Sequence, residues 1–329
     1  MIAVVIPCYK VSAHICELIS RIGEEVNLIF VVDDACPEHS GQLVETACSD
    51  PRLHVLYHAV NQGVGGAVLT GYSASILAGA EVIVKIDGDG QMDPALMSAF
   101  VAPIVRGEAD YAKGNRFFEV ETVRKMPIVR LIGNAGLSFL TKLSSGYWDL
   151  FDPTNGYTAI SAKVAAHLST SKLNKRYFFE SDMLFRLNTM RAVVIDIPMY
   201  AEYGNEQSGL KATHEIPRFL FGNIKNLLKR ILYNYFLRNF SYATLELVFG
   251  IAFICFGSVF GVSNWIEQAL SGTYASAGTV MLSALPVIIG LQLLLGFLNY
   301  DMASVPVYPL QKRLHFDARG IKSVTEENQ

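Results

Sequence analysis

The stretch VIVKIDGDGQMDP, residues 82 to 94, places three carboxylates directly after a run that is typical of a buried strand. Residues 82–86 are rich in β-branched side chains, which favour a strand. Asp87, Asp89 and Asp93 follow at once, among glycines. In an open parallel sheet, ligands bind outside the carboxyl ends of the strands, which is where Asp87 and Asp89 would lie. The stretch therefore predicts both a core strand and a ligand site at its end.

Similar runs on either side of this stretch indicate the class of the fold. Short β-branched segments alternate with helical segments along the N-terminal part of the chain. This alternation predicts an α/β fold in which helices cover a mostly parallel, Rossmann-like sheet. The strands are expected at residues 3–6, 28–32, 54–57, 82–86 and 193–197, with helices between the first four.

The composition of the chain points to a membrane more than to any other partner. Of its 329 residues, 51% are apolar, a high share for a purely soluble protein. The net charge of -3 gives no indication of nucleic acid as a partner. The five cysteines form no CxxC pair, so we expect reduced thiols in a cytosolic domain. The N-terminal sequence MIAVVIPCYK lacks the basic region of a secretory signal.

Two apolar stretches, residues 242–262 and 278–298, are long enough to cross a hydrocarbon core of about 30 Å as helices. The alternative is that they are buried helices of a large soluble core. Lys and Arg are absent between residues 241 and 311 but flank both stretches. By the positive-inside tendency both flanks face the cytoplasm, and the loop at residues 263–277 lies outside. Glu246, near the start of the first stretch, is expected at the membrane interface.

The segment ahead of these stretches, residues 216–240, is amphipathic and basic. On a helix its apolar and basic side chains separate to opposite faces. The apolar face holds Leu220, Ile224, Leu227 and Ile231, and the basic face holds Arg218, Lys225 and Lys229. We interpret it as a helix in the headgroup layer, with its cations near anionic lipid. The alternative is an ordinary amphipathic helix packed on the soluble domain.

The spacing of residues in and around the carboxylate cluster argues against three common kinds of binding loop. An EF-hand loop needs Gly and Glu at the positions of Met92 and Ser98. The glycines of NQGVGGAVLTG lack the third Gly of a dinucleotide fingerprint, because Val68 takes its place, and no GK[ST] makes a P-loop. Two carboxylates on a short turn suit Mg²⁺ or Mn²⁺, which in turn binds diphosphate oxygens. A turn without a ligand is the structural alternative.

The chain carries six motifs in order: AVVIPCYK, VVDDACPEHS, NQGVGGAVLTGY, VIVKIDGDGQMDP, KGNRF and DPTNGY. In these it resembles family 2 glycosyltransferases of the GT-A fold, in the polyprenol-phosphate branch that includes dolichol-phosphate mannose synthase and the bacterial bactoprenol glucosyltransferases. The resemblance covers residues 1–210, and the basic segment with two spans is similar to the membrane-anchored bacterial members. It implies inverting, metal-dependent transfer of a sugar from a nucleotide sugar, UDP-sugar being favoured over GDP-sugar, to undecaprenyl or dolichyl phosphate at the cytoplasmic membrane face.

The resemblance also implies roles for individual residues. Those implied for the metal, Mg²⁺ or Mn²⁺, are Asp87, Asp89 and Gln91. Those implied for the nucleotide sugar are Pro7, Tyr9, Asp33, Asn61, Gly65, Asp87 and Asp89. Those implied for the lipid phosphate are Arg116, Arg130 and Asn134. The implied catalytic residues are Asp152, Asp89 and Arg116, and a further acidic pair is matched by Glu180 and Asp182.

Two loops depart from the family pattern. Lys10 and Val11 follow Tyr9 where members often have PxYNE, and Ala35 and Cys36 stand within what is often DDGSxD. These changes bear on the base that the site accepts more than on the chemistry.

The mechanism that we expect follows from the acceptor. A lipid monophosphate is already an anion near neutral pH, so it needs positioning and charge balance rather than a strong general base. Arg116 and Arg130 would hold it, while a metal on Asp89 neutralises the departing nucleoside diphosphate. The alternatives are that the arginines are surface cations and that Asp152 only starts a turn before Pro153.

Two other functions are alternatives to lipid-linked sugar transfer. Processive polysaccharide synthases share the GT-A motifs, but they resemble each other in a QxxRW motif. Neither Trp148 nor Trp265 lies in that pattern. A non-catalytic scaffold would be favoured by loss of metal ligands, but Asp87 and Asp89 are present, as is Gln91.

The expected organisation has four segments: a GT-A domain at 1–210, interfacial helices at 211–240, a hairpin of two spans at 241–300 and a cytosolic tail at 301–329. The catalytic domain and both termini are expected in the cytoplasm, at a bacterial inner membrane. Expected partners besides the substrates are the membrane, a second copy of the chain, and downstream flippase or glycan-transfer machinery.

Overall fold

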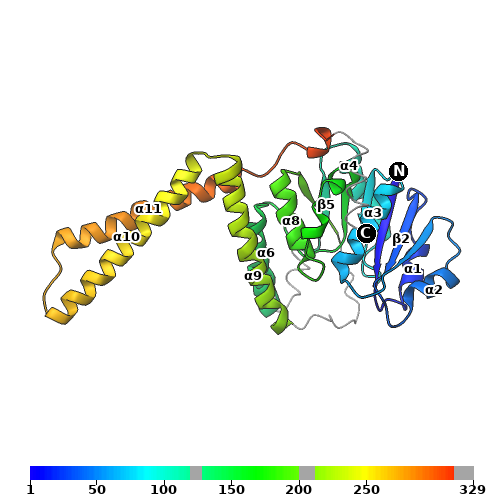
Figure 1. Cartoon of the computed structure of the whole chain (residues 1–329), viewed down its shortest axis with the longest axis horizontal. Coiled ribbons are helices and arrows are strands. Elements are labelled where there is room, and N and C mark those ends of the chain that lie inside the picture. The colour runs from blue at the N-terminus through cyan, green and yellow to red at the C-terminus, as the bar shows by residue number, and fades with distance from the viewer. Residues whose placement is uncertain (119–127, 200–211, 315–329) are drawn as a thin grey trace. The chain divides into compact units, whose positions relative to one another are not determined.

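The structure, a computed structural model, describes residues 1–118, 128–199 and 212–314. It forms two compact units, shown in Figure 1. Unit 1 comprises Met1–Leu227 and the segment that starts at Pro306, and unit 2 is Leu228–Val305. These units divide the chain at other points than the four expected segments, because residues 216–227 and the segment from Pro306 belong to unit 1.

Unit 1 is built on one sheet of seven strands, which is mostly parallel, as predicted. The strands are β1 (Ile2–Cys8), β2 (Leu28–Asp33), β3 (Leu53–Tyr57), β4 (Val82–Lys85), β5 (Tyr111–Asn115), β6 (Thr158–Ser161) and β7 (Val194–Pro198). Their order is β3-β2-β1-β4-β6-β5-β7. Only β6 among these strands runs against its neighbours β4 and β5, and β1 at the centre pairs in parallel with β2 and β4.

Two of these strands, β5 and β6, were not predicted from the sequence. β5 has the sequence YAKGN and is entirely buried, with Lys113 at 1% exposure. β6 is only four residues long and also begins with a buried polar residue, Thr158. Neither shows the apolar run of a core strand, because buried ion pairs and hydrogen bonds satisfy their polar side chains instead.

Helices cover both faces of the sheet (Figure 1). On one face the main core joins Val4 and Ile6 of β1 to side chains of α1, α2 and α4. On the other face α3 crosses β1 so closely that a Cβ on Gly71 would lie 2.2 Å from Val5 Cγ1. The helices are α1 (Ile15–Ser20), α2 (Ser40–Ala47), α3 (Val64–Leu77), α4 (Met97–Val105), α6 (Ile128–Ser145), α7 (Ala162–Ala166) and α8 (Phe179–Met190), with short 3₁₀ turns η1 (Pro94–Leu96), η2 (Thr170–Lys172) and η4 (Leu310–Lys312).

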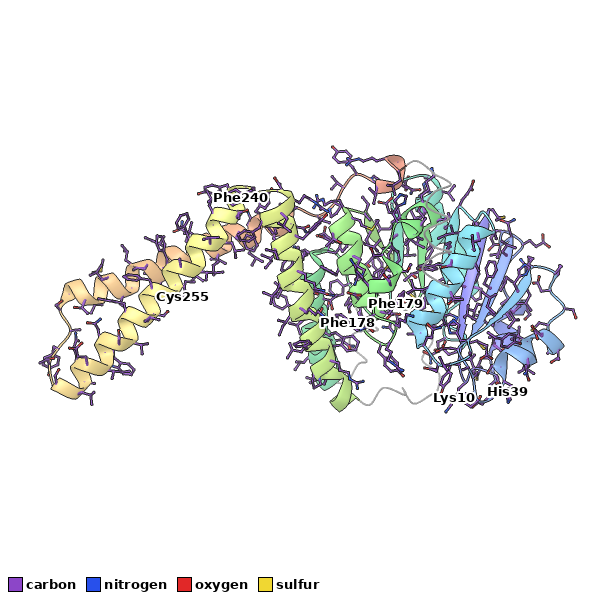
Figure 2. All side chains as sticks on the ribbon, in the orientation of Figure 1. Lys10, His39, Phe178, Phe179, Phe240 and Cys255 are labelled. Carbon is purple, nitrogen blue, oxygen red and sulfur yellow. The ribbon has the colours of Figure 1, made fainter. Side chains whose placement is uncertain are left out.

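Helix α9 (Ala212–Ile231) packs on unit 1 through its polar side. Asn223 lies within 2.5 Å of Ser144 of α6, and Asn226 donates to the buried carboxylate of Asp182 at 3.0 Å. Phe178, labelled in Figure 2, packs against Gly222. The apolar side chains of α9 that stay exposed are Ile216, Leu220, Phe221, Ile224 and Leu228. The domain therefore binds the asparagine side of this helix and leaves the larger apolar side chains uncovered.

Unit 2 is a hairpin of two long apolar helices, α10 (Tyr242–Ser271) and α11 (Ala277–Ala303), preceded by the π-helical turn η3 (Leu232–Arg238). Both helices are long and apolar enough to cross a membrane, and only 17% and 11% of their most apolar windows are buried. Such low burial argues against core helices of a soluble protein. Both helices are longer than predicted. α10 continues without a break to Gly272, a residue in the left-handed conformation that ends the helix.

Small residues and one buried ion pair hold unit 2 together. A Cβ on Gly290 would lie 2.8 Å from the carbonyl oxygen of Gly250, so the two helix backbones touch at this point. Asp301 of α11 accepts a two-pronged bond from Arg230 at 2.5 and 2.9 Å and one from Tyr235 at 2.5 Å. A pair this deeply buried fixes the turn η3 against the end of α11.

The segment after α11 returns to unit 1 and is held there by one carboxylate. Asp110, fully buried at the amino end of β5, accepts the backbone N–H groups of Leu310 and Gln311, each at 2.7 Å. It also accepts the N–H of Val193 at 2.7 Å. The Gln311 side chain bonds the carbonyl oxygens of Ile104 and Ala109. Residues 310–312 are thus a docked strap rather than part of a separate tail.

We expect Asp110→Ala to release this strap, because the part-buried N–H groups of Leu310 and Gln311 lose their acceptor, together with the buried N–H of Val193. The free energy of unfolding of unit 1 should fall by about 3 kcal/mol or more, and trypsin should cut faster after Lys312. Urea unfolding and timed digestion of the full chain in detergent measure both effects. Glu108→Ala is the control, because that carboxylate is exposed and forms its ion pair, with Arg106, at the surface. Unchanged digestion in Asp110→Ala would show that other contacts hold the strap.

Candidate functional site

The loop after β4 lies against the loop after β1 at the carboxyl edge of the sheet. A Cβ on Gly88 would lie 3.1 Å from Val11 Cγ2 and 3.4 Å from the carbonyl oxygen of Pro7. Gly90 has a φ of +76° and faces His14. Both glycines are needed, the first for close approach and the second for its backbone conformation. The carboxylates that they flank stand at the sheet edge where the sequence placed them.

Asp89 and Gln91 lie half-exposed in this loop, with the Gln91 N–H donating to Asp89 Oδ1 at 3.1 Å. Asp93, the third carboxylate of the stretch, caps η1 through the Ala95 N–H and pairs with Arg21 at 2.9 Å. Asp93 is therefore explained by local structure, whereas Asp89 is partly exposed in the loop.

Asp87 is tied to a buried lysine at the end of β4. Lys85 Nζ lies 2.9 Å from Asp87 Oδ1 and 3.2 Å from Glu180 Oε1 of α8. Burial lowers the pKa of Lys85, but Asp87 and Glu180 outweigh that effect and leave it above its usual value. Burial raises the pKa of Glu180, opposed by Lys85. The first carboxylate of the motif thus rests on a buried cluster of charges.

These residues fit a divalent cation of the Mg²⁺ type. Within the described residues no three His, Cys, Asp or Glu side chains converge as a closed metal cage. Mg²⁺ uses one or two carboxylates and completes its shell with water and substrate phosphate. Asp87 and Asp89 supply such oxygens at an accessible turn, and side-chain exposure of Asp87 is 30%. The donor set suits a cation that arrives with a diphosphate.

The two adjacent carboxylates after β2 anchor loops. Asp33 accepts the N–H groups of Cys36 and Gly41, both at 2.7 Å. Asp34 accepts those of Gln62 and Gly63, both at 2.7 Å, and also contacts His58 at 2.7 Å. The predicted contact of Asp33 with a nucleoside would therefore act through the shape of its loop. Asp34 was missed, although its place beside Asp33 in VVDDACPEHS was a usable signal.

Asn61 and Gly65, predicted beside the nucleoside, both have structural partners. Asn61 Nδ2 donates to the carbonyl oxygen of Asp34 at 3.1 Å. Gly65 N–H donates to the carbonyl oxygen of Lys175 at 2.9 Å, and a Cβ on Gly65 would lie 2.6 Å from Phe179, which Figure 2 labels. Gly65 is thus required for close packing at the start of α3.

Pro7 and Tyr9 flank the same edge from the loop after β1. Pro7 is half-buried, and Tyr9 is 44% exposed with the Lys10 ammonium 5.7 Å from its ring centre. Figure 2 shows Lys10 and His39, from the loops after β1 and β2, at this edge. An exposed ring beside a cation is a surface on which a base can stack.

Arg116 and Asp152, predicted to have separate roles, bind each other. Arg116 Nε and Nη2 donate to Asp152 Oδ2 and Oδ1 at 2.7 and 2.8 Å. Asp152 is 1% exposed, and Asn155 Nδ2 donates to it at 3.0 Å. Burial acts to raise the pKa of Asp152, but Arg116 outweighs it and holds that pKa below its usual value. A carboxylate engaged in this way holds the guanidinium in one orientation.

A second buried lysine shapes the loop that carries Asp152. Lys113 Nζ bonds Asp196 Oδ1 at 2.8 Å and the carbonyl oxygen of Phe151. Asp196 in turn accepts the Phe151 N–H at 2.6 Å. Phe151 is therefore held from both sides, and its neighbour Asp152 takes a φ of +46°. Sequence reasoning missed Lys113 as a contributor, although KGNRF contains it, and Asp196 carries no signal because it lies in a strand.

The predicted acidic pair of α8 does not act as a pair. Glu180 faces Lys85, whereas Asp182 accepts from Asn226 at 3.0 Å, from the Asn174 N–H at 2.9 Å and from Arg186 at 3.1 Å. Residues two apart on a helix point about 200° apart, so one helix serves two sites. Asp182 supports α9, and Glu180 alone belongs to the edge.

The predicted lipid-phosphate residues of α6 are described only in part. Asn134 is half-buried on this helix, and the side chain of Arg130 lies outside the described residues. Around them α6 exposes Ile128, Ile132 and Phe139, each more than half exposed. The helix therefore presents apolar side chains outward, as α9 does.

The chain is similar to known proteins over the part that builds this site. Residues 3–169 match the family described as "Glycosyl transferase family 2". A UDP-N-acetylglucosamine--dolichyl-phosphate N-acetylglucosaminyltransferase of Methanococcus voltae is 25% identical over 68% of this chain and 98% of its own. A polyprenol monophosphomannose synthase of Mycolicibacterium smegmatis is 30% identical over 60% of this chain and 75% of its own.

Among solved structures, glucosyl-3-phosphoglycerate synthase from Mycobacterium tuberculosis in complex with Mn²⁺, UDP and glucosyl-3-phosphoglycerate has a TM-score of 0.52. It is 18% identical and covers 70% of this chain and 79% of its own. This likeness shows a common fold. It confirms the GT-A architecture that the motifs predicted.

The loop after β2 contains a backbone conformation that its residue disfavours. Ala35 has a φ of +52° at the position where the DDGSxD pattern has Gly. A left-handed conformation costs a residue with a Cβ about 1–2 kcal/mol, and glycine avoids this cost. The hydrogen bonds of Asp33 and Asp34 hold the loop in this form nonetheless.

We expect Ala35→Gly to stabilise the protein by about 0.5 kcal/mol, because relief of strain exceeds the added flexibility of the unfolded chain. Thermal unfolding in detergent measures the change. The control is Ala47→Gly in α2, where φ is helical and stability should fall by about 0.5 kcal/mol. A loss of stability in Ala35→Gly would mean that the alanine methyl contributes packing that outweighs the strain.

Proposed function

The chain belongs to glycosyl transferase family 2, and on this basis we propose that it transfers a sugar from a nucleotide sugar, with UDP favoured over GDP, to polyprenyl phosphate at the cytoplasmic face of a membrane. The observation that carries the proposal is one chain with both a carboxylate turn at the end of β4 and a hairpin of two apolar helices. The relatives named above act on dolichyl phosphate or make polyprenol monophosphomannose, which supports a lipid phosphate as acceptor.

The exposed apolar side chains of α9 support a position at a membrane surface. Ile216 and Phe221 are 64% and 71% exposed, and Lys225 and Lys229 are exposed on the same helix. If α9 served only to pack on unit 1, its apolar side chains would face the domain, yet the buried side chains along its described residues are polar: Asn223, Asn226 and Arg230. An amphipathic helix with uncovered apolar residues and cations suits anionic lipid headgroups.

The donor would bind at the edge formed by the loops after β1, β2 and β4. Asp87 and Asp89 would hold Mg²⁺ or Mn²⁺ against the diphosphate, with Gln91 beside them. The metal would neutralise the charge that builds on the leaving nucleoside diphosphate. The exposed ring of Tyr9 offers a surface for the base.

The acceptor would be positioned by arginine. A lipid monophosphate is already an anion, so this chain need not remove a proton from it before it attacks the anomeric carbon and inverts it. Arg116 would bring the phosphate into line, with Arg130 and Asn134 as further contacts. Asp152 would act through Arg116 by fixing the plane of its guanidinium.

We expect the full chain in detergent to form a lipid-linked sugar when given labelled nucleotide sugars, polyprenyl phosphate and Mn²⁺ or Mg²⁺. The label should move to the organic phase with one nucleotide sugar of the panel, and chelation by EDTA should stop it. Asp89→Asn should lower transfer by a hundredfold or more, on the order of the loss of a metal ligand. Its control is Asp93→Asn in the same stretch, which should stay near wild type. Label that reaches only water would exclude the lipid acceptor.

Arg116→Lys tests the acceptor site. Lysine keeps the charge but loses the planar fork, so kcat/KM for polyprenyl phosphate should fall about tenfold to a hundredfold. Hydrolysis of the nucleotide sugar without lipid should change much less. Arg106→Lys is the matched control, because Arg106 makes the same two-pronged bond to Glu108 at the surface. Equal losses in both reactions would move Arg116 to the donor.

A further inference from the structure

Lys85 is a fully buried cation directly beneath the donor edge. It is the last residue of β4, is 1% exposed and was not singled out by its sequence motif. Lysine is almost never buried to this extent without a partner. Its two partners come from different elements, Asp87 from the turn that follows β4 and Glu180 from α8.

The partners differ in their access to solvent. The Glu180 side chain is 14% exposed, whereas that of Asp87 is 30% exposed at the edge. The ammonium contacts Asp87 through Oδ1 at 2.9 Å. A carboxylate bound through one oxygen is fixed in rotation, so the direction of the second oxygen, Oδ2, is set as well.

A third segment closes over this contact. A Cβ on Gly156, in the loop that follows Asp152, would lie 2.2 Å from Asp87 Oδ2 and 2.7 Å from Lys85 Nζ. The backbone at Gly156 therefore packs directly on the ion pair. Three separate motifs, KIDGDGQ, DPTNGY and FFESDM, meet at one ammonium group.

We propose that Lys85 is a positioning residue of the donor site, which holds the carboxylate of Asp87 in one orientation while Glu180 holds the ammonium. The inference rests on the proposed function, because it takes Asp87 as a ligand of the metal and diphosphate. Neither Lys85 nor Glu180 touches the donor. Glu180, predicted as half of an acidic pair, acts through Lys85.

A purely structural role makes the opposite prediction for cation binding. A positive charge 2.9 Å from a metal ligand weakens the attraction of that ligand for a divalent cation. If Lys85 only balanced charge in the core, its removal together with Glu180 would leave affinity for the metal unchanged or higher. If it orients Asp87, its removal lowers affinity, since a partner that orients a ligand is typically worth tenfold to a hundredfold.

The test is the double variant Lys85→Met with Glu180→Gln, which removes both charges of the buried pair and keeps their volume. Mn²⁺-dependent binding of UDP to the full chain in detergent is measured by calorimetry, with the unfolding midpoint beside it. We expect a folded protein that binds UDP with Mn²⁺ about tenfold more weakly or worse. Lys85→Arg should keep most of the affinity, because it retains the charged donor.

Equal or tighter binding in the folded double variant would overturn the proposal. If the double variant does not fold, Glu180→Gln alone decides: it frees the ammonium from α8 and should weaken UDP binding several-fold, and unchanged affinity would reject the role of the pair. A wild-type chain that binds no UDP with Mn²⁺ would instead count against the proposed function. The two failures are therefore distinguishable.

Discussion

Buried carboxylates that accept backbone N–H groups hold the loops of this molecule in shape. A backbone donor away from water must find an acceptor, and a loop has no neighbouring strand to supply one. Asp33 closes the loop after β2 on itself, and Asp34 fixes the next loop along the edge. Asp110 does the same at the amino end of β5 for the segment that returns from α11. A site made of loops depends on such anchors, because binding energy is lost when loops must be ordered first.

The buried cations depend on carboxylates in the same way. Lys85 and Lys113 would each be too costly to bury alone, and each has an acidic partner within 2.9 Å, as does the partly exposed Arg116. Their partners are also the residues that shape the edge, since Asp87 is a motif carboxylate and Asp196 fixes the loop of Asp152. The main role of these ion pairs is therefore to hold the loops of the edge in one conformation.

Helix α8 contacts two regions with different tasks. Through Glu180 it reaches the charges beneath the donor edge, and through Asp182 it binds Asn226 of the amphipathic helix α9. Both contacts are buried, and both come from one turn of a rigid helix. Within unit 2 the pair of Arg230 and Asp301 gives the hairpin a fixed base of its own. Polar contacts thus act beside apolar ones, such as Phe178 on Phe219 and Tyr235 on Phe297, in placing α9 and η3 within their units.

The sequence by itself determined the class of the fold and the elements with strong periodicity. Strands β1 to β4 and β7, the amphipathic α9 and both apolar helices each carry a pattern that depends only on local spacing, and the order of six motifs identified the family. Strands β5 and β6 could not be predicted, because Lys113 and Thr158 are buried polar residues whose partners are distant in the sequence. The cost of removing these side chains from water is offset by contacts that only the folded protein provides.

The candidate site also has features that the sequence predicted and features that only the tertiary structure revealed. The place of Asp87 and Asp89 at the edge followed from a strand and its turn. Only the tertiary structure decided that Arg116 and Asp152 bind each other, that Glu180 and Asp182 serve different partners, and that Lys85 lies beneath Asp87. The contacts of Arg116 with Asp152, of Glu180 with Lys85 and of Asp182 with Asn226 join residues tens of positions apart, so no local pattern encodes them. Local sequence pattern placed the carboxylates at the end of a strand, whereas packing decided which charges are buried and which of them meet.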